Sequence, residues 1–384
     1  MKRSTTRILT THTGSLPRPE ELTRLMYAVV ERQPVDRAVL AARVREAVRE
    51  AVQKQAEAGI DIVSDGEMSK PGFANYVAER LTGFGGEPRP FRARDLADFP
   101  EVRQQFASEG QAHIITPGCN GPISYRGEPA VQTDIANLKA ALQGVPVEEA
   151  FIPAASPGCV VQITHNTYYP SRKEYLYALA DALKHEYKAI TNAGFLLQVD
   201  CPDLAMGRHV EFPDASSEEY RRNVALHVEA LNHALADIPP ERTRVHVCWG
   251  NYVGPHHWDV PLRELIDLLL QVRAQALSIE AANPRHAHEW EVFETVKLPD
   301  DKLLLPGVID TKTNYIEHPE LVAQRIVRFA RLVGRENVIA STDCGFGTFV
   351  GFSAVVPRVA YAKLAALAEG ARLASQRLWG ATAG

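Results

Sequence analysis

Short apolar runs alternate with longer amphipathic stretches along most of the chain. The apolar runs predict buried β-strands at residues 8–13, 60–65, 151–155, 195–200, 245–248, 277–281, 303–309 and 338–341. The stretches between them carry apolar residues at three- and four-residue spacing, which predicts helices at residues 40–58, 172–192, 218–236, 261–275 and 319–332. Eight short strands, each followed by a crossover, favour a (β/α)8 TIM barrel of the α/β class over an open, doubly wound sheet.

One segment breaks this alternation. Residues 83–127 are rich in Gly, Pro and Arg and follow the second predicted strand. An insertion at this point lies on the catalytic face of a barrel, where it serves as a lid or a partner surface, or packs as a loop on the rim. The 384 residues therefore fit a single barrel domain, 1–384, with an insertion at about 83–127.

The composition narrows the class of protein. Apolar residues make up 45% and charged residues 23% of the chain, which suffices for a large core. The 42 basic and 47 acidic residues give a net charge of −5, so the chain has no electrostatic footprint for nucleic acid or for an anionic membrane. The sequence contains neither a run of about 18 apolar residues nor the apolar region of a signal peptide, so we expect a cytoplasmic protein without membrane contact.

The cysteines and two adjacent histidines are candidate metal ligands by residue type. Five scattered cysteines, an odd number, point to metal binding or catalysis rather than to a disulfide framework. Cys119, Cys159 and Cys201 lack suitable neighbours and are expected to be small buried residues. His256 and His257, in the sequence GPHHWD, lie in a loop without matching partners, which favours exposed or helix-capping roles.

Chemically active residues gather at the carboxyl ends of the predicted strands, where TIM barrels carry their active sites. These positions hold Ser15, Glu67, Asp200, His246, Cys248, Glu280, Asp310 and Cys344. His246 and Cys248 are two residues apart on a strand, so both side chains face the same side and can converge on one metal ion. Together with Glu280 and Cys344 they offer one imidazole, two thiolates and one carboxylate, which is a reasonable tetrahedral zinc set.

A family resemblance rests on motifs that occur in a fixed order between about residues 8 and 360. They are THTGSLPRP, VSDGEM, QVDCPDLA, HVCWGN, SIEAANP, GVIDTKTN and STDCGFG. The chain resembles the catalytic domain of cobalamin-independent methionine synthase, and especially the short, single-barrel members of a superfamily that includes epoxyalkane:coenzyme M transferase. The resemblance implies that zinc, held by His246, Cys248, Glu280 and Cys344, activates a thiol for S-alkylation, because coordination lowers the pKa of the thiol.

The resemblance also assigns the acceptor site. It implies that Ser15 and its neighbouring backbone hold the carboxylate of homocysteine, and that Glu67 and Asp200 hold its ammonium. The chemistry agrees, because two carboxylates near a thiolate-bound zinc are costly unless a cation lies between them, and an amino thiol supplies that cation. The sulfonate of coenzyme M would prefer Arg or Lys. The alternative is that Glu67 and Asp200 are ordinary strand-end carboxylates that pair with Arg or cap helices.

The methyl donor stays open at this point. The full-length enzymes of the family carry an additional N-terminal half, for which this chain is too short, so methyltetrahydrofolate, a methylcobalamin-type carrier and an epoxide all remain as donors. Where the family has a His in an Asp-x-His-Ser-Pro stretch that assists proton transfer, this chain has Asp310, Thr311, Lys312 and Thr313. We therefore count Asp310 and Lys312 as candidate catalytic residues. Lys312 would donate a proton or hold an anion, or would be a solvated or structural lysine.

Three functions follow from these patterns. The leading hypothesis is a zinc-dependent S-methyltransferase that converts homocysteine to methionine. The alternative enzyme is a thiol alkyltransferase similar to epoxyalkane:coenzyme M transferase. An alternative of another class is a non-catalytic protein that holds zinc in a structural or storage site. The sequence leaves the oligomeric state open, with a homo-oligomer among the options.

Overall fold

The centre of the molecule is a sheet of eight parallel strands. The computed structural model describes residues 1–88, 92–108, 116–351 and 353–380. The strands are β1 (Leu9–Thr10), β2 (Ile62–Ser64), β5 (Glu149–Ala155), β6 (Leu196–Asp200), β7 (Thr243–Val247), β8 (Ala276–Ile279), β9 (Leu303–Ile309) and β10 (Ile339–Thr342). They pair in the order β1-β10-β9-β8-β7-β6-β5-β2, and each pair is parallel. Each of the predicted strands is therefore confirmed, with ends that differ by a few residues.

The two outer strands of this order, β1 and β2, meet and close the barrel. The Asp61 backbone N–H, just before β2, donates to the Thr10 carbonyl at 3.2 Å. The Asp61 carboxylate accepts from the backbone N–H of Thr10 at 2.8 Å and from Arg7 at 2.7 Å. A further bond runs from the Thr11 hydroxyl to the Ile62 carbonyl at 3.0 Å. The sheet is thus a nearly closed (β/α)8 TIM barrel, as predicted.

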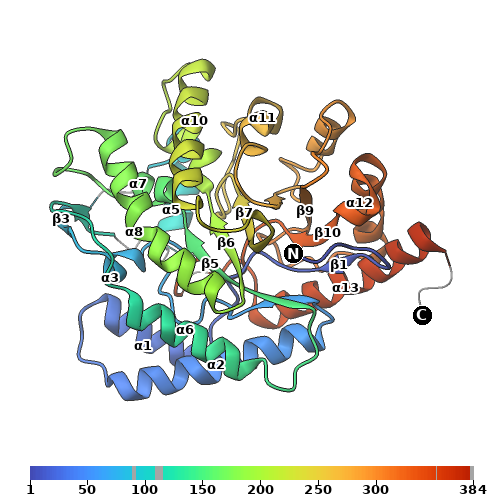
Figure 1. The fold of residues 1–384 in the computed structure, drawn as a ribbon, viewed down its shortest axis with the longest axis horizontal. Helices are drawn as coiled ribbons and strands as arrows, with labels where there is room; N and C mark the ends of the chain where they lie inside the picture. Colours follow the sequence, from blue (N-terminus) through green and yellow to red (C-terminus); the bar gives the residue numbers. More distant parts are fainter. Residues whose placement is uncertain (89–91, 109–115, 352, 381–384) are drawn as a thin grey trace.

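Helices surround the barrel (Figure 1). The longer ones are α1 (Glu20–Val30), α2 (Arg37–Glu57), α5 (Pro100–Ser108), α6 (Glu128–Ala141), α8 (Arg172–Asn192), α10 (Ser217–Ala234), α12 (Pro319–Val333) and α13 (Pro357–Trp379). Short ones are α3 (Val77–Arg80), α4 (Arg94–Asp98), α7 (Pro157–Ile163), α9 (Gly207–Val210) and α11 (Ile266–Leu269), and the 3-10 turns are η1 (Pro202–Leu204), η2 (Pro240–Arg242), η3 (Leu262–Glu264), η4 (Glu289–Glu294) and η5 (Arg335–Asn337). Local sequence starts α10, where Ser216 and Glu219 form a reciprocal capping box.

The prediction of a single helix over residues 261–275 is wrong. The structure has η3 and α11 there, two short turns separated by Leu265. Tertiary contacts take up the backbone groups of this stretch, since the Leu262 N–H donates to the Glu289 carboxylate at 2.6 Å and the Glu264 carbonyl accepts from Arg221. An apolar pattern with helical spacing therefore folds as an irregular, buried connection.

The barrel interior changes from apolar to polar along its axis. A cluster fills the end where the strands begin, and it consists of Leu9, Ile62, Phe151, Leu196, Ala276, Leu303, Leu305 and Ile339. Above it lies the fully buried Arg244 of β7, which donates to the Thr11 hydroxyl at 2.8 Å and to the His12 carbonyl at 2.7 Å. Polar side chains thus begin above this apolar cluster and continue to the carboxyl ends of the strands.

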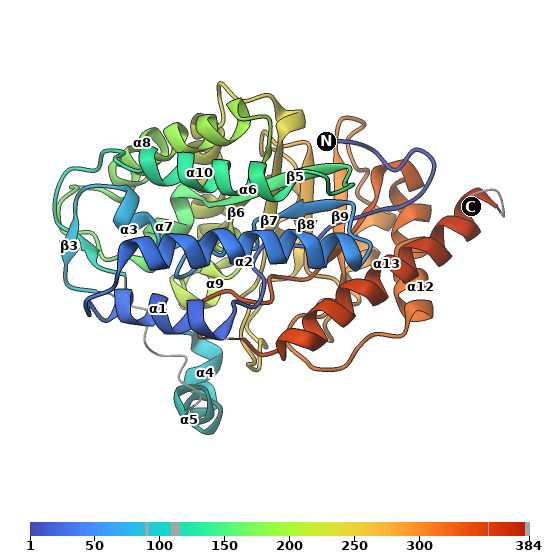
Figure 2. The ribbon, with the colours of Figure 1, turned by 90° about the horizontal axis from the view of Figure 1, so that it is seen from below.

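The predicted insertion lies between β2 and α6. Residues 83–127 include α4 and α5 and a small antiparallel pair of β3 (Phe84–Gly86) and β4 (Gly118–Cys119), while α3 precedes them and residues 89–91 and 109–115 lie outside the described residues. Figure 2 shows α4 and α5 projecting on the side opposite the N-terminus. The Asp95 carboxylate of α4 accepts from the Tyr252 hydroxyl at 2.5 Å and from the His256 N–H at 3.1 Å. Because both partners follow β7, α4 contacts the face of the barrel where the strands end.

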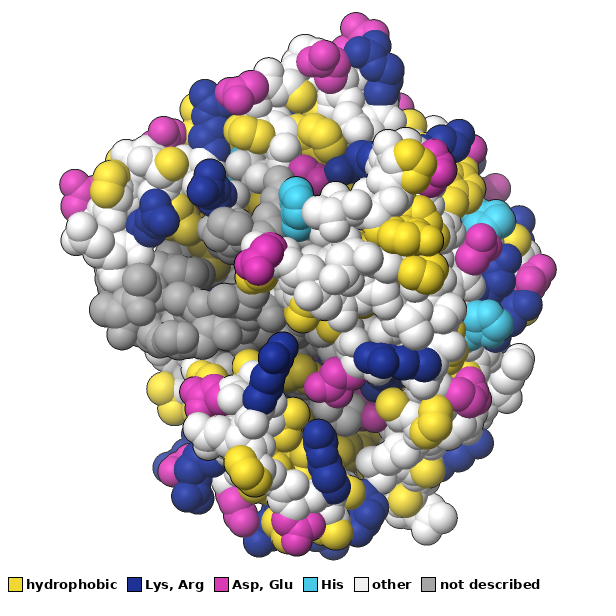
Figure 3. Space-filling view, turned by 90° about the vertical axis from the view of Figure 1, so that its left-hand side faces the viewer, with side chains coloured by type: hydrophobic (Ala, Val, Ile, Leu, Met, Phe, Trp, Pro, Cys, Tyr) yellow, Lys and Arg dark blue, Asp and Glu magenta, His cyan; other side chains and the backbone are white. Residues whose placement is uncertain are grey.

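The surface carries charges of both signs. On the face drawn in Figure 3, Lys and Arg side chains are interspersed with Asp and Glu side chains. This mixture agrees with the nearly balanced composition of 42 basic and 47 acidic residues. Within the part of the chain that the structure describes, none of the helices is long and apolar enough to cross a membrane.

Candidate metal and acceptor site

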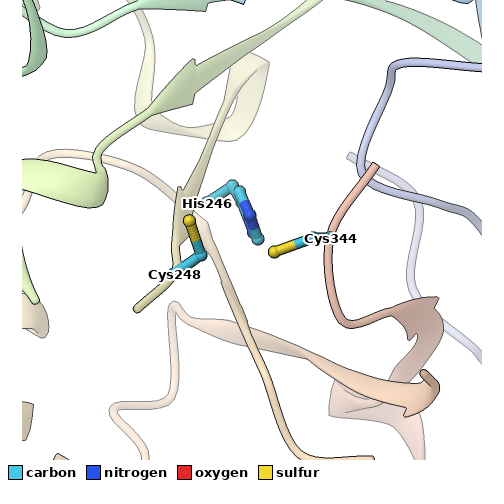
Figure 4. Close-up of side chains that lie close together, drawn as sticks. All are labelled: His246, Cys248 and Cys344. Carbon is cyan, nitrogen blue, oxygen red and sulfur yellow. The ribbon is translucent and has the colours of Figure 1, made fainter. Parts of the chain in front are cut away.

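Three predicted ligands converge at the carboxyl ends of β7 and β10. His246 lies on β7, Cys248 follows that strand directly, and Cys344 follows β10. Their ligand atoms all lie within 4.8 Å of one another, and the three side chains are buried (Figure 4). The Nδ1 atom of His246 has no hydrogen-bond partner among the described atoms. One imidazole nitrogen without a hydrogen-bond partner and two sulfur atoms form a donor set that fits zinc.

The electrostatics of this group already favour a thiolate. The hydrogen bond with Cys344 and the neighbouring His246 lower the pKa of Cys248 to about 5, although burial opposes the shift. Burial raises the pKa of Cys344 well above its ordinary value, and the hydrogen bond with Cys248 adds to this effect. The two cysteines therefore carry one thiolate charge between them more readily than two. A bound cation would stabilise the second thiolate.

The fourth predicted ligand, Glu280, lies beside the group with both oxygens engaged. It directly follows β8 and is completely buried. Its Oε1 atom accepts from the Trp249 backbone N–H at 2.8 Å. Its Oε2 atom accepts from the Asn283 amide at 2.8 Å and from the Lys312 ammonium at 2.8 Å. The structure thus brings Glu280 next to the three ligands, in the company of a cation.

A carboxylate that sequence reasoning missed, Asp343, holds the loop that carries Glu280. It accepts from the backbone N–H groups of Ala281, Ala282 and Asn283, each at 2.8 Å. Burial raises the pKa of Asp343 to about 6. The available signal was its place in the motif STDCGFG, directly before Cys344. Asp343 therefore links the chain segment of one candidate ligand to the loop of another.

The two carboxylates that were predicted to hold an ammonium are both buried. Glu67 follows β2 and Asp200 ends β6. Burial and the Asp200 charge raise the pKa of Glu67 to about 8, although Lys70 and Arg18 act in the opposite direction. Burial raises the pKa of Asp200 to about 6. The Oε2 atom of Glu67 has no hydrogen-bond partner among the described atoms. Such a pair is suited to accept a cationic group.

Lys70, close to Glu67, escaped the sequence reasoning as well. It is buried, its ammonium donates to the Pro153 carbonyl, and it lies 4.5 Å from the centre of the Tyr76 ring. The motif VSDGEM ends just before it, so its nearness to a predicted site residue was the signal. The positive charge of Lys70 lowers the pKa of Glu67, but it offsets only part of the rise that burial and Asp200 cause.

Ser15 joins the end of β1 to the loop after Cys344. Its carbonyl accepts from the Phe346 N–H at 2.8 Å, and its hydroxyl accepts from the Gly347 N–H at 3.4 Å. Gly345 approaches so closely that a Cβ there would lie 1.9 Å from the Ser15 Oγ atom. The residue predicted to hold the carboxylate thus lies next to the loop of the candidate ligand Cys344.

The two candidate catalytic residues on the loop after β9 make different contacts. The Asp310 carboxylate accepts from the Lys312 backbone N–H at 3.1 Å and from the Thr313 hydroxyl at 2.7 Å, so it holds the turn. The Lys312 ammonium reaches Glu280 instead. Although burial opposes it, the charges of Glu280 and Cys344 raise the pKa of Lys312 above its ordinary value. The structure places only Lys312 of this pair against the candidate metal ligands.

The remaining ligand candidates lie elsewhere. His256 is buried and its Nδ1 atom is 3.0 Å from the Asp259 carboxylate, so the exposed or helix-capping role predicted for it is wrong. Asp259 lies three residues after His256 and also contacts a second histidine, His286, at 3.0 Å, although these two are 27 positions apart. Cys119, Cys159 and Cys201 are buried, as expected.

A comparison with known protein families matches the parts of the chain that carry the candidate site residues. Residues 8–88 and 157–367 match the family described as "Cobalamin-independent synthase, Catalytic domain". The matched ranges include every candidate site residue, with Ser15 and Glu67 in the first range and the others in the second. They leave out most of the insertion.

Relatives of similar length match over nearly the whole chain. The methionine synthase of Thermococcus kodakarensis is 26% identical over 366 residues, which cover 95% of this chain and 93% of the relative. The methionine synthase of Saccharolobus solfataricus is 25% identical over 373 residues, which cover 96% and 95%. Among solved structures, a B12-independent methionine synthase from Shewanella sp. W3-18-1, in complex with selenomethionine, has a TM-score of 0.75 at 24% identity and covers 97% of this chain and 99% of that one. This last likeness supports the barrel fold.

Proposed function

Because the chain belongs to the cobalamin-independent methionine synthase family, by a match to the catalytic domain over most of its length, we propose that it methylates the thiol of homocysteine to give methionine with the help of a zinc ion. The protein is accordingly an enzyme, a methyltransferase. The observation that carries the proposal is the convergence of His246, Cys248 and Cys344 within 4.8 Å at the carboxyl ends of the barrel strands.

In this proposal, His246, Cys248 and Cys344 hold the zinc, and Glu280 is the remaining candidate ligand. Bound zinc supplies Lewis acidity that keeps a coordinated thiol as the nucleophilic thiolate at neutral pH. The side chains around it exclude water, since the three ligands are less than a tenth exposed. A dry site strengthens the electrostatic interactions that hold the thiolate.

The acceptor is oriented by its ammonium and its carboxylate. Glu67 and Asp200 hold the ammonium between them, which relieves the repulsion and desolvation that raise both pKa values. Ser15 and the neighbouring backbone hold the carboxylate. Held at both ends, the amino acid directs its sulfur to the metal ligands. Coenzyme M carries no ammonium, so the same carboxylate pair disfavours the epoxyalkane:coenzyme M type of reaction.

The loop after β9 contributes on the other side of the site. Lys312 places a positive charge against Glu280, and Asp310 holds the turn that carries Lys312. We propose both as part of the active site, Lys312 through its charge and Asp310 through the loop. The methyl donor is methyltetrahydrofolate or a methylcobalamin-type carrier, and the assay below includes both.

The test combines zinc content, zinc-edge X-ray absorption and methyl transfer on the purified protein. We expect one zinc per chain and two sulfur ligands, which rise to three with homocysteine and stay at two with coenzyme M. Methionine should form from homocysteine with one of the two donors. A site that binds zinc but ignores both thiols would instead support a non-catalytic zinc protein, and a response to coenzyme M alone would support the alkyltransferase.

Variants separate the metal from the acceptor. Cys344→Ser should lose zinc and activity together, whereas Cys119→Ser, a buried cysteine in the insertion, should keep both. Asp200→Asn should keep zinc and weaken homocysteine binding by about tenfold or more, because the ammonium loses a buried charge partner. Full activity of a zinc-free Cys344→Ser protein would contradict the mechanism, and unchanged homocysteine affinity of Asp200→Asn would contradict the acceptor.

A further inference from the structure

Arg18 lies in the loop after β1, close in sequence to Ser15, and it connects the loops that carry two of the proposed acceptor contacts. Its guanidinium donates to the Gly347 carbonyl at 2.7 Å, in the loop after β10. It also donates to the Glu67 carbonyl at 3.0 Å and to the Lys70 carbonyl at 2.7 Å, in the loop after β2. One side chain thus binds the backbone of both loops that lie beside its own.

The bonds to the loop after β2 hold the turn that carries Glu67. The Glu67 carbonyl accepts from the Lys70 backbone N–H at 3.1 Å as well as from Arg18. Because Arg18 binds the carbonyl, it holds the backbone of Glu67 and does not occupy the carboxylate. The Oε2 atom of that carboxylate has no hydrogen-bond partner among the described atoms, so it is available to a ligand.

The bond to the loop after β10 supports the other end of the acceptor. The Gly347 N–H donates to the Ser15 hydroxyl at 3.4 Å, and the Phe346 N–H donates to the Ser15 carbonyl at 2.8 Å. Arg18 binds the carbonyl of the same Gly347. It therefore holds this loop against Ser15, the residue that we propose to bind the carboxylate of the acceptor.

The chemistry of arginine suits this role. A guanidinium presents several N–H donors in a rigid, planar fork, so one side chain can bind several carbonyls at once. Burial lowers the pKa of Arg18, and the nearby charges of Glu67 and Asp65 act in the opposite direction. The charge of Arg18 in turn lowers the pKa of Glu67, against the effect of burial, and thus favours the ionised carboxylate that an ammonium ligand needs.

Farther from the acceptor contacts, backbone bonds join the same two loops without Arg18. The Phe73 N–H donates to the Thr348 carbonyl at 3.2 Å. The Val350 N–H donates to the Pro71 carbonyl at 2.7 Å. Loss of Arg18 should therefore shift the parts of the loops next to the acceptor, while the barrel and the rest of these loops stay folded.

We propose that Arg18 is a positioning residue for the acceptor amino acid, which holds Glu67 in place for the ammonium and the loop beside Ser15 in place for the carboxylate. The inference rests on the proposed function and deepens it. It assigns the alignment of both ends of the acceptor to one side chain that lies behind the contacting groups.

The test measures ligand binding to the zinc-loaded protein by calorimetry. Methionine is compared with methylthiobutyrate, which lacks the ammonium, and with methylthiopropylamine, which lacks the carboxylate. The wild type should prefer methionine over each analogue by about 100-fold, because a site built for a charged group is left unpaired without it. In Arg18→Met, each of these two preferences should fall about tenfold while the zinc content stays the same.

Three further variants control the experiment. Arg18→Lys keeps the charge but loses the fork, so each preference should still fall about threefold or more, and this variant decides the matter if Arg18→Met fails to fold. Asp200→Asn should reduce only the preference over methylthiobutyrate. Arg335→Met removes another half-buried arginine, whose guanidinium donates to the Leu378 carbonyl at the opposite end of β10, and should change neither preference.

The outcomes separate this inference from the proposed function. Preferences that keep their wild-type values in both Arg18 variants are the result expected of a merely structural arginine, and they would overturn the inference while leaving the methyltransferase intact. A fall in only one of the two preferences would also overturn it, because the proposal covers both ends. Equal affinity of the wild type for methionine and both analogues would overturn the proposed acceptor site and the inference together.

Discussion

Glu67 has a backbone conformation that side chains rarely adopt. Its φ angle is +56°, in the left-handed region, and the preceding Gly66 has a φ angle of +68°. Its N–H donates to the Asp65 carboxylate at 2.9 Å, and its carbonyl accepts from Arg18 at 3.0 Å. These bonds hold a conformation that costs energy on its own, which is common where a side chain must be aimed into a site.

The raised pKa of Glu67 leads to a prediction about ligand binding. With a pKa of about 8, Glu67 is mostly protonated at pH 7, whereas an ammonium ligand needs the ionised carboxylate. Methionine should therefore bind about fivefold more tightly at pH 8 than at pH 7, and its binding at pH 7 should release close to one proton. Calorimetry in buffers of different ionisation enthalpy measures that proton.

The control variants make the assignment specific. Glu67→Gln should remove the proton release, and Glu148→Gln, on the surface, should keep it. Methionine is the suitable ligand because its thioether does not titrate. A proton release that persists in Glu67→Gln would assign the event to another group and remove the ammonium site from the proposal.

At the scale of single residues, the sequence predicts which residues are candidate ligands from their chemical type, but it does not predict which residues they contact. His246, Cys248 and Cys344 stood out because imidazoles and thiols at strand ends are few, and the structure brings them together. The bond between Glu280 and Lys312 joins residues 32 positions apart, and the local spacing of a sequence carries no information on such a contact. The ordering role of Asp343 was hidden for the same reason.

At the scale of elements, the pairing of β9 with β10 is irregular next to the site. The register shifts between Ser341 and Thr342, and Asp343 and Cys344 follow immediately. Irregular pairing of this kind turns side chains away from the regular alternation of a strand. Gly307 of β9 makes room for the turn, because a Cβ there would lie 2.1 Å from the Asp343 Oδ1 atom.

Gly307→Ala should therefore disturb both stability and the metal. The added methyl group cannot avoid Asp343, whose Cα atom would lie only 2.7 Å from it, so the carboxylate must leave the loop of residues 281–283. We expect a loss of about 2–4 kcal/mol in the free energy of unfolding by urea, together with weaker zinc binding. Gly121→Ala, where the nearest atom is 3.5 Å away, should change neither. Wild-type stability of Gly307→Ala would contradict this account of the β9 and β10 pairing.

Secondary-structure elements were predictable from the sequence where burial determines whether a segment is a strand or a helix. The apolar runs gave all eight strands because every barrel strand is covered on both faces. The stretch 261–275 has the spacing of a helix, yet bonds from Glu289 and Arg221 take up its backbone groups. Such competition from distant side chains is invisible in local periodicity, which is why this connection was predicted wrongly.

At the scale of the whole molecule, one side chain makes several of the hydrogen bonds that close the barrel. The Asp61 carboxylate accepts from the Thr10 N–H and hydroxyl and from Arg7, across the seam between β1 and β2. The parallel pairing of the sheet ends at these two strands. Side-chain bonds thus take over where the ladder of backbone bonds is thin.

Asp61→Ala should destabilise the protein as a whole. The loss of three hydrogen bonds in a largely buried place should lower the free energy of unfolding by about 2–4 kcal/mol, as measured by urea denaturation. Asp61→Asn should lose less, since it keeps an acceptor. Asp237→Ala removes an exposed ion pair with Lys188 and should cost no more than about 0.5 kcal/mol. A stable Asp61→Ala protein would show that backbone pairing alone closes the seam.

The architecture and the family were predictable from the sequence, and the packing of the insertion was not. The order of the strands follows from seven consecutive crossovers between eight strands, and the family follows from motifs at the strand ends. The contact of Asp95 with Tyr252 joins residues 157 positions apart in a segment without regular periodicity. Its place on the catalytic face followed from topology alone.

The order of the site residues along the chain divides the catalytic work into two blocks. The proposed acceptor contacts, Ser15, Glu67 and Asp200, all precede β7, whereas the proposed metal ligands and Lys312 all follow from β7 onward. Recognition of the amino acid and activation of the sulfur are therefore assigned to separate parts of one barrel. A change of acceptor requires new side chains only in the earlier block, so new thiol substrates can evolve while the metal chemistry is kept.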